Sequence, residues 1–104
     1  MPAVRLNKTT NMSETYHAQH PDPTKKGTRI SRAKYDVIHS AMRTVLEASG
    51  PTALQPLIVA VAGMVGDAFE GSIPWYVTTV KLDMESKGEL LCDRTVSPHL
   101  HVLQ

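Results

Sequence analysis

Several residue types are scarce in this sequence of 104 residues, and each shortage excludes a class of protein. A single cysteine, Cys92, excludes an internal disulfide and is typical of a protein in a reducing cytoplasm. No apolar run approaches the roughly 20 residues that a membrane-spanning helix needs. The N-terminus also lacks the apolar segment of a secretory signal. We therefore expect a single cytoplasmic domain with no membrane partner.

Core-forming side chains are scarce in the first third of the chain. The sizeable apolar residues of positions 1–34 are Val4, Leu6, Tyr16, Ile30 and two methionines. So few apolar groups cannot offset the entropy that is lost when a segment becomes ordered. The prolines and the glycine of HPDPTKKGTRIS also argue against a regular element there. We expect residues 1–30 to form a flexible arm and residues 31–104 to form the folded domain.

Acidic side chains are scarce in the same region. Residues 1–34 carry seven basic and two acidic side chains, a net charge of +5. Residues 35–104 carry four basic and eight acidic side chains, a net charge of −4. A basic arm on an acidic body raises the expectation that the arm touches nucleic acid. The alternative is that the arm keeps the chain soluble or docks on its own acidic body.

Apolar residues at helical spacing predict a first helix over residues 32–48, with Ser31 as its N-cap and Gly50 and Pro51 at its end. The second helix begins near Thr52 or at Pro56. Its GMVG stretch lacks the lysine and hydroxyl residue of a phosphate-binding loop and the basic residues of an RNA-clamping loop. We interpret these glycines as close packing against a neighbouring helix, or as the helix end.

The third helix is expected to begin at Ser72, to tolerate Pro74 in its first turn and to end at Gly88. Its buried face is formed by Ile73, Tyr76, Val77, Val80 and Met84. The segments ELLCD and HLHVL predict a hairpin after it. With two helices meeting at a short turn, the sequence predicts an α+β fold of the winged-helix type: three helices plus a C-terminal β-hairpin, with a disordered basic N-terminal arm.

Residues 21–103 resemble a family of small, uncharacterised bacterial proteins with a winged-helix-like fold. The resembling stretches are PDPTKKGTRISRAKYDVI, WYVTTVKLDMESKGEL and the closing HLHVL. A helix that ends Met-Glu-Ser-Lys-Gly before a strand is also how many winged-helix regulators pass from reading helix to wing. The resemblance implies a fold and brings no activity, cofactor or catalytic residue.

A reading helix buries one face and presents a polar, often basic face to the major groove of DNA. The outer face of the third helix is expected to carry Trp75, Thr78, Leu82, Glu85 and Ser86. Its two lysines are offset by two acidic residues, so DNA contact would depend on the arm and on the tip of the hairpin. The candidate nucleic-acid-binding residues are Lys25, Lys26, Arg29, Arg32, Thr78 and Arg94.

Trp75 and Leu82 are seven residues apart and therefore lie together on this helix. One interpretation buries them under the hairpin or the returning arm. The other makes them a surface for a homodimer or a protein partner, because tryptophan is enriched at interface hot spots. Exposure of both side chains would favour the partner. Burial of both, with the basic residues on one surface, would favour DNA.

His99 and His101 alternate along the last expected strand and so share one face. If Asp93 faces His99 across the hairpin, Cys92 points to the opposite face. A one-residue slip places Cys92 opposite His101 and creates a set of one cysteine and two histidines. The sequence leaves this register open and places no further ligand, so we expect no metal and no cofactor. No nucleophile has an orienting base, so we also expect no enzyme and no small-molecule ligand.

Overall fold

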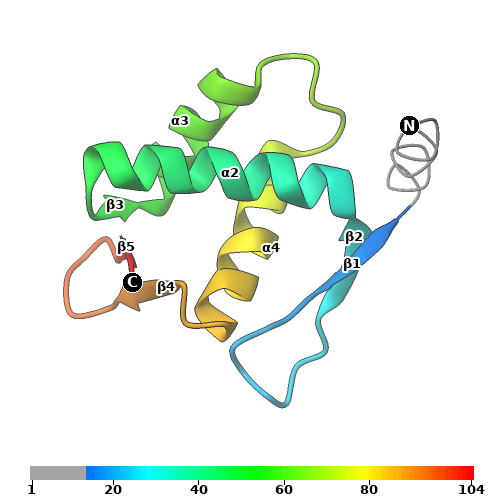
Figure 1. Ribbon diagram of the computed structural model, residues 1–104. Coiled ribbons are helices and arrows are strands. Elements are labelled where there is room, and N and C mark those ends of the chain that lie inside the picture. Colours follow the sequence, from blue (N-terminus) through cyan, green and yellow to red (C-terminus); the bar gives the residue numbers. More distant parts are fainter. Residues whose placement is uncertain (1–13) are drawn as a thin grey trace, which may run out of the picture.

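The computed structural model describes residues 14–104, and within them three helices are joined by two small antiparallel sheets (Figure 1). The helices are α2 (Arg32–Ser49), α3 (Leu54–Val65) and α4 (Ile73–Ser86). The first sheet is the hairpin of β1 (Thr15–Ala18) and β2 (Thr28–Ser31). The second has the order β3 (Thr52–Ala53), β5 (Leu100–Leu103) and β4 (Leu90–Asp93). The α+β class is confirmed.

The expected first helix is confirmed as α2. The Ser31 hydroxyl accepts a 3.2 Å hydrogen bond from the Lys34 N–H and so satisfies a free donor of the first turn. Gly50 ends the helix with a φ of 74° and donates its N–H to the Leu46 carbonyl. This left-handed conformation suits glycine and is followed at once by Pro51, which cannot continue the helix.

The glycines of α3 do not play the packing role that the sequence suggested. An added Cβ at Gly63 would meet nothing within 4 Å, so no neighbouring helix approaches it closely. Gly66 instead ends the helix with a φ of 72°, which confirms the alternative interpretation. The connection to α4 covers residues 66–72, which is longer than the 3–4-residue turn of a helix-turn-helix motif.

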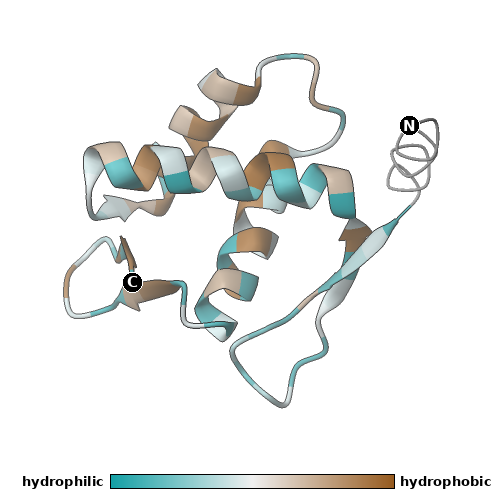
Figure 2. Ribbon diagram, viewed as in Figure 1, coloured by the Kyte–Doolittle hydropathy of each residue, from teal (hydrophilic) through white to brown (hydrophobic). Residues whose placement is uncertain are grey.

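The inner face of α4 is confirmed at its centre. Val77, Val80 and Met84 are fully buried, while Ile73 and Tyr76 are partly buried against the same core. The Ser72 hydroxyl caps the helix by accepting from the Trp75 N–H at 3.2 Å. Apolar residues of α2, α3 and α4 face one another across this core (Figure 2). Within the described part of the chain, every helix is too short or too polar to cross a bilayer.

The expectation of a flexible arm is wrong for residues 14–30. They form most of the β1–β2 hairpin, in which Tyr16 pairs with Ile30 and Ala18 with Thr28. Ala18 and Ile30 are only 2% and 5% exposed, so even this apolar-poor segment adds two side chains to the buried interior. The hairpin contacts both α2 and α4. The remainder of the predicted arm, residues 1–13, lies outside the described residues.

The C-terminal hairpin is confirmed, and the structure adds a strand that the sequence did not suggest. β3, only two residues long, pairs with β5 and precedes α3 directly. The register of the hairpin places Cys92 opposite His101 and Asp93 opposite Leu100. Of the two registers left open by the sequence, this is the one that brings the cysteine and a histidine together.

Candidate functional site

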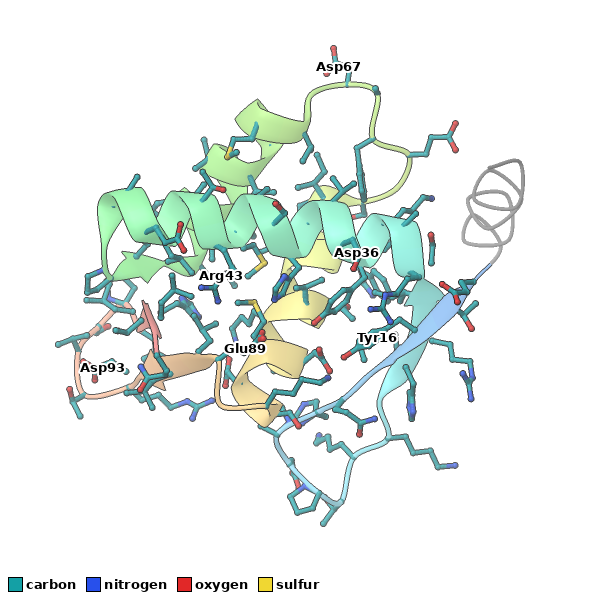
Figure 3. All side chains as sticks on the ribbon, in the orientation of Figure 1. Tyr16, Asp36, Arg43, Asp67, Glu89 and Asp93 are labelled. Atoms are coloured by element: carbon teal, nitrogen blue, oxygen red, sulfur yellow. The ribbon has the colours of Figure 1, made fainter. Side chains whose placement is uncertain are left out.

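A buried carboxylate holds the N-terminal hairpin against α4. Asp83 is fully buried, and its oxygens accept hydrogen bonds from the Tyr16 hydroxyl at 3.0 Å and the Gln19 N–H at 2.7 Å. Lys87 reaches the same carboxylate at 2.5 Å, and the Tyr35 hydroxyl of α2 also donates to it. Figure 3 shows Tyr16 between the hairpin and the helices. Four donors therefore join the hairpin, α2 and α4 at one residue.

The surroundings of Asp83 favour its charged form. Burial alone would raise the pKa of this carboxyl, but the hydrogen bonds from Gln19, Lys87 and the two tyrosines outweigh it and lower the pKa. The pKa of Tyr35 is raised, first by burial and then by its hydrogen bond to the carboxylate. Asp83 thus remains ionised and the phenol remains a donor, so this network is structural at neutral pH.

The turn of this hairpin brings one of the sequence-predicted cations, Lys26, beside α4. Lys25 and Lys26 are exposed in the turn, and Arg29 is exposed on β2. Lys26 lines a cavity of about 200 Å³ between the turn and α4, together with Trp75 and Leu82. One candidate residue of the arm, Lys26, therefore lies beside the apolar pair of the third helix.

The outer face of α4 differs from the predicted one by one residue. Trp75 is 47% exposed, and Thr78 and Leu82 are half-buried. Glu85 does not belong to this face, because its side chain is only 8% exposed and pairs with Lys81 at 2.6 Å. Where α4 packs against β4, the side chain of Glu85 points inward, toward the second sheet. The outer face is therefore free of carboxylates.

Ion pairs sort the basic residues into two groups. Four basic side chains of the described residues pair with an acidic residue one helical turn away: Arg32, Arg43, Lys81 and Lys87. Arg32 also lies over the ring of Tyr16, so this predicted nucleic-acid contact is already engaged. Among the described residues, the lysines and arginines without an ion pair are Lys25, Lys26, Arg29, Lys34 and Arg94.

The two β-hairpins lie on either side of α4 (Figure 1). Arg94 is exposed at the start of the β4–β5 turn, next to Asp93, which accepts hydrogen bonds from the Thr95 N–H and hydroxyl. Three of the cations without an ion pair thus lie on the N-terminal hairpin and one on the C-terminal hairpin. Lys34 is the exception, since it lies over the rings of Phe69 and Tyr76.

A polar cluster that the sequence did not predict lies between α4 and the second sheet. Glu85, Cys92 and His101 each place one potential ligand atom within 4.8 Å of the other two. The expectation of no metal rested on the lack of a further ligand for the cysteine–histidine pair. The structure supplies a further potential ligand, Glu85 of α4. No local sequence pattern links position 85 to position 101.

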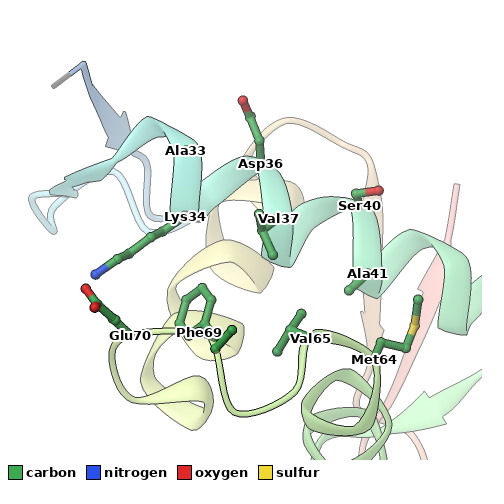
Figure 4. Close-up of a pocket in the computed structure, with 11 residues that line it drawn as sticks. Ala33, Lys34, Asp36, Val37, Ser40, Ala41, Met64, Val65, Phe69 and Glu70 are labelled. Carbon is green, nitrogen blue, oxygen red and sulfur yellow. The ribbon is translucent and has the colours of Figure 1, made fainter. Parts of the chain in front are cut away.

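A cavity of about 770 Å³ lies between α2 and the segment after α3 (Figure 4). Its walls are mainly apolar, from Val37, Met64, Val65 and Phe69, with Lys34 and Glu70 at one end. It holds no group that could act as a nucleophile beside an orienting base. None of the residues predicted to bind nucleic acid or a partner lines this cavity.

Neither the curated proteins nor the solved structures contain a match to this chain. One family model does match, over residues 15–100, and its description is "Family of unknown function (DUF6958)". The match begins with the first residue of β1 and ends with the first residue of β5, so it includes the N-terminal hairpin, all three helices and β4. The chain therefore belongs to this family of unknown function.

Proposed function

We propose that this protein is a non-enzymatic DNA-binding module of the winged-helix type, with α4 as the helix that faces the DNA. α4 passes directly into the β4–β5 hairpin, and β3, which follows α2, completes a three-stranded sheet beside it. In this arrangement the β4–β5 hairpin corresponds to a wing. The β1–β2 hairpin supplies a second flank on the other side of α4 (Figure 1).

One observation carries the proposal: Lys25, Lys26, Arg29 and Arg94 lie on the two hairpins and have no ion pair among the described residues 14–104. DNA affinity comes largely from cations that neutralise phosphates and release counterions. A cation that is already paired must give up its partner to make such a contact, whereas these four need not. Their position on two separate hairpins distributes positive charge over two parts of the surface, as contact with several phosphates requires.

The chemistry of α4 supports the same proposal. Because Glu85 and Asp83 are turned inward, the outer face presents Trp75, Thr78 and Leu82 without a charge that would repel phosphate. The Thr78 hydroxyl can donate to a phosphate or a base edge. The face lacks an arginine or an asparagine for reading bases, so binding is expected to be weak and to depend little on DNA sequence.

Fluorescence anisotropy of a labelled duplex of random sequence, at low and at physiological salt, tests this function. The wild-type affinity is expected to fall steeply with salt. Substitution of Lys25, Lys26 and Arg29 by alanine is expected to reduce the slope of log K against log salt by roughly 2–3 units, or about 0.9 for each phosphate that is no longer neutralised. Arg94→Ala is expected to remove about one further unit.

Arg43→Ala is the matched control, since this arginine already pairs with Glu47 on α2 and is not one of the four cations of the proposal. It removes one positive charge and should leave the salt slope unchanged. If the wild type does not bind at low salt, or if Arg43→Ala weakens binding as much as Arg94→Ala, the proposal is wrong.

A second candidate function is a protein-interaction or homodimerisation domain. The observation in its favour is the 47% exposure of Trp75, which a reading helix does not need. Leu82, however, is half-buried beside the hairpin turn, so the apolar patch is smaller than the sequence suggested. Sedimentation equilibrium of the wild type and of Trp75→Ala tests the homodimer. A dimer that the substitution dissociates would support it, and a wild-type monomer at high concentration would exclude it.

A further inference from the structure

Three side chains of metal-ligating type converge where α4 packs against the C-terminal hairpin. Glu85 comes from α4, Cys92 from β4 and His101 from β5, and their ligand atoms lie within 4.8 Å of one another. Cys92 and His101 are direct partners in the strand register, so the backbone hydrogen bonds of the sheet hold these two groups together. Glu85 is added by the packing of the helix on that sheet.

His101 contributes to this cluster a buried nitrogen atom that lacks a hydrogen-bond partner. The residue is 2% exposed, and its Nδ1 lies 2.9 Å from the backbone carbonyl oxygen of Thr52. A carbonyl oxygen can only accept, so Nδ1 carries the proton and Nε2 presents a lone pair. Nε2 is buried and has no hydrogen-bond partner. A buried acceptor without a partner costs free energy unless a donor or a metal ion occupies its lone pair.

The groups that contact His101 and Glu85 from behind resemble the outer shell of a metal site. Metal-bound histidines usually donate their other N–H to a carbonyl or carboxylate, which fixes the tautomer and the orientation of the ring. Thr52 has this position behind His101. Lys81 has the corresponding position behind Glu85, at 2.6 Å, and both side chains are largely buried. Both ligands are thus oriented without a metal.

We propose that Glu85, Cys92 and His101 form a binding site for a zinc ion. A thiolate, an imidazole and a carboxylate are the three ligand types that zinc accepts. With Zn–S and Zn–N distances of about 2.3 and 2.0 Å, the ligand atoms of one thiolate, one imidazole and one carboxylate around a tetrahedral ion lie roughly 3.3–3.5 Å apart. The cluster therefore needs to contract by only about 1 Å, which side-chain rotation of Glu85 and Cys92 can supply.

A fourth position is open to solvent. Cys92 and His101 line a cavity of about 620 Å³ that the β4–β5 turn borders with Arg94 and His99. Water from this cavity can complete the tetrahedron, as in sites with three protein ligands. The cavity also gives the ion a path to the site. The zinc site does not depend on the proposed DNA binding, since none of its three ligands lies on the outer face of α4.

Titration of the reduced, metal-free full-length protein with Co²⁺ tests the site. We expect one equivalent to produce a thiolate-to-cobalt charge-transfer band and the intense d–d bands of a tetrahedral ion, and we expect Zn²⁺ to displace it. Cys92→Ser should abolish the charge-transfer band. In competition with a zinc indicator it should weaken zinc binding at least about 10-fold, the smallest loss expected even for an outer-shell partner.

His17→Asn is the matched control, because it removes an exposed histidine of the N-terminal hairpin and leaves the cluster intact. It should bind zinc like the wild type. Glu85→Gln should weaken binding while the charge-transfer band remains, which distinguishes a three-ligand site from a lone thiolate. Circular dichroism of Cys92→Ser checks that this small change preserves the fold. If saturating Co²⁺ gives no charge-transfer band, or if Cys92→Ser binds zinc as tightly as the wild type, the site does not exist.

Discussion

The hydroxyl of Tyr16 donates a 3.0 Å hydrogen bond to the carboxylate of Asp83, a residue 67 positions later in the chain. Tyr16 lies on β1 and Asp83 on α4, so this contact joins the N-terminal hairpin to the helix that carries Trp75. Tyr35 of α2 meets the same carboxylate, and its ring lies 4.3 Å from that of Tyr16 between centroids. The position of the basic hairpin beside α4 thus depends on one buried charge.

Substitution of Asp83 by asparagine is expected to lower the free energy of unfolding by roughly 2–4 kcal/mol, because it removes a buried charge that accepts from four donors. Urea denaturation measures this loss. Asp36→Asn is the matched control, since its carboxylate forms an exposed ion pair with Arg32 and should change stability by about 0.5 kcal/mol or less. Equal losses in the two variants would contradict a special role for Asp83.

Stability should also depend on pH through Asp83. Its pKa in the folded protein is lowered below the ordinary value of 3.8, so the unfolded chain takes up a proton at a higher pH than the folded one does. The stabilising contribution of this carboxylate is therefore complete above pH 3.8 and is lost as the pH falls through its folded pKa. Thermal unfolding between pH 2 and pH 7 should show a smaller acid-induced decrease in stability in Asp83→Asn than in the wild type.

The hairpin shows why part of this fold could not be predicted from the sequence. Apolar content correctly predicted α2, α4 and the C-terminal hairpin, because each of them places a regular apolar face on the core. The hairpin of residues 15–31 has little such content. It is held by hydrogen bonds to Asp83, and a pairing across 67 positions leaves no local periodicity to detect.

The cluster of Glu85, Cys92 and His101 could not be predicted from the sequence for a related reason. Cys92 and His101 were recognised as partners in one of two possible registers, and only the folded sheet decides between them. Glu85 was expected on the outer face of α4, because helical spacing gives angles around the helix but does not say where a neighbouring sheet begins. The same limitation applies to Trp75 and Leu82, whose different exposures reflect the hairpin turn beside them.

Gly27 is expected to be indispensable for this hairpin. A Cβ at this position would lie 1.9 Å from the carbonyl oxygen of Ala18, a backbone atom that cannot move without breaking the strand pairing. Gly27→Ala should lower the free energy of unfolding by about 1–3 kcal/mol and increase hydrogen exchange of the β1 and β2 amides. Chemical denaturation and exchange followed by mass spectrometry measure the two effects.

Gly63→Ala is expected to have the opposite effect on stability from Gly27→Ala. This glycine is exposed within α3, and a Cβ added there would meet nothing within 4 Å, so alanine should stabilise the helix by about 0.5–1 kcal/mol. If Gly63→Ala is the more destabilising of the two variants, the close approach at Gly27 is not what fixes the hairpin.

Trp75 is the only tryptophan of the chain, so its fluorescence reports on the outer face of α4 alone. With 47% of the residue exposed, we expect emission typical of a partly hydrated indole in the free protein. If α4 faces DNA, an unlabelled duplex should quench this emission and protect the indole from iodide, with the same midpoint as the anisotropy titration. The variant in which Lys25, Lys26 and Arg29 are alanine should need a higher DNA concentration for the same quenching, because these cations supply part of the affinity. DNA binding without any change at Trp75 would place the contact on the hairpins and exclude α4 as the reading helix.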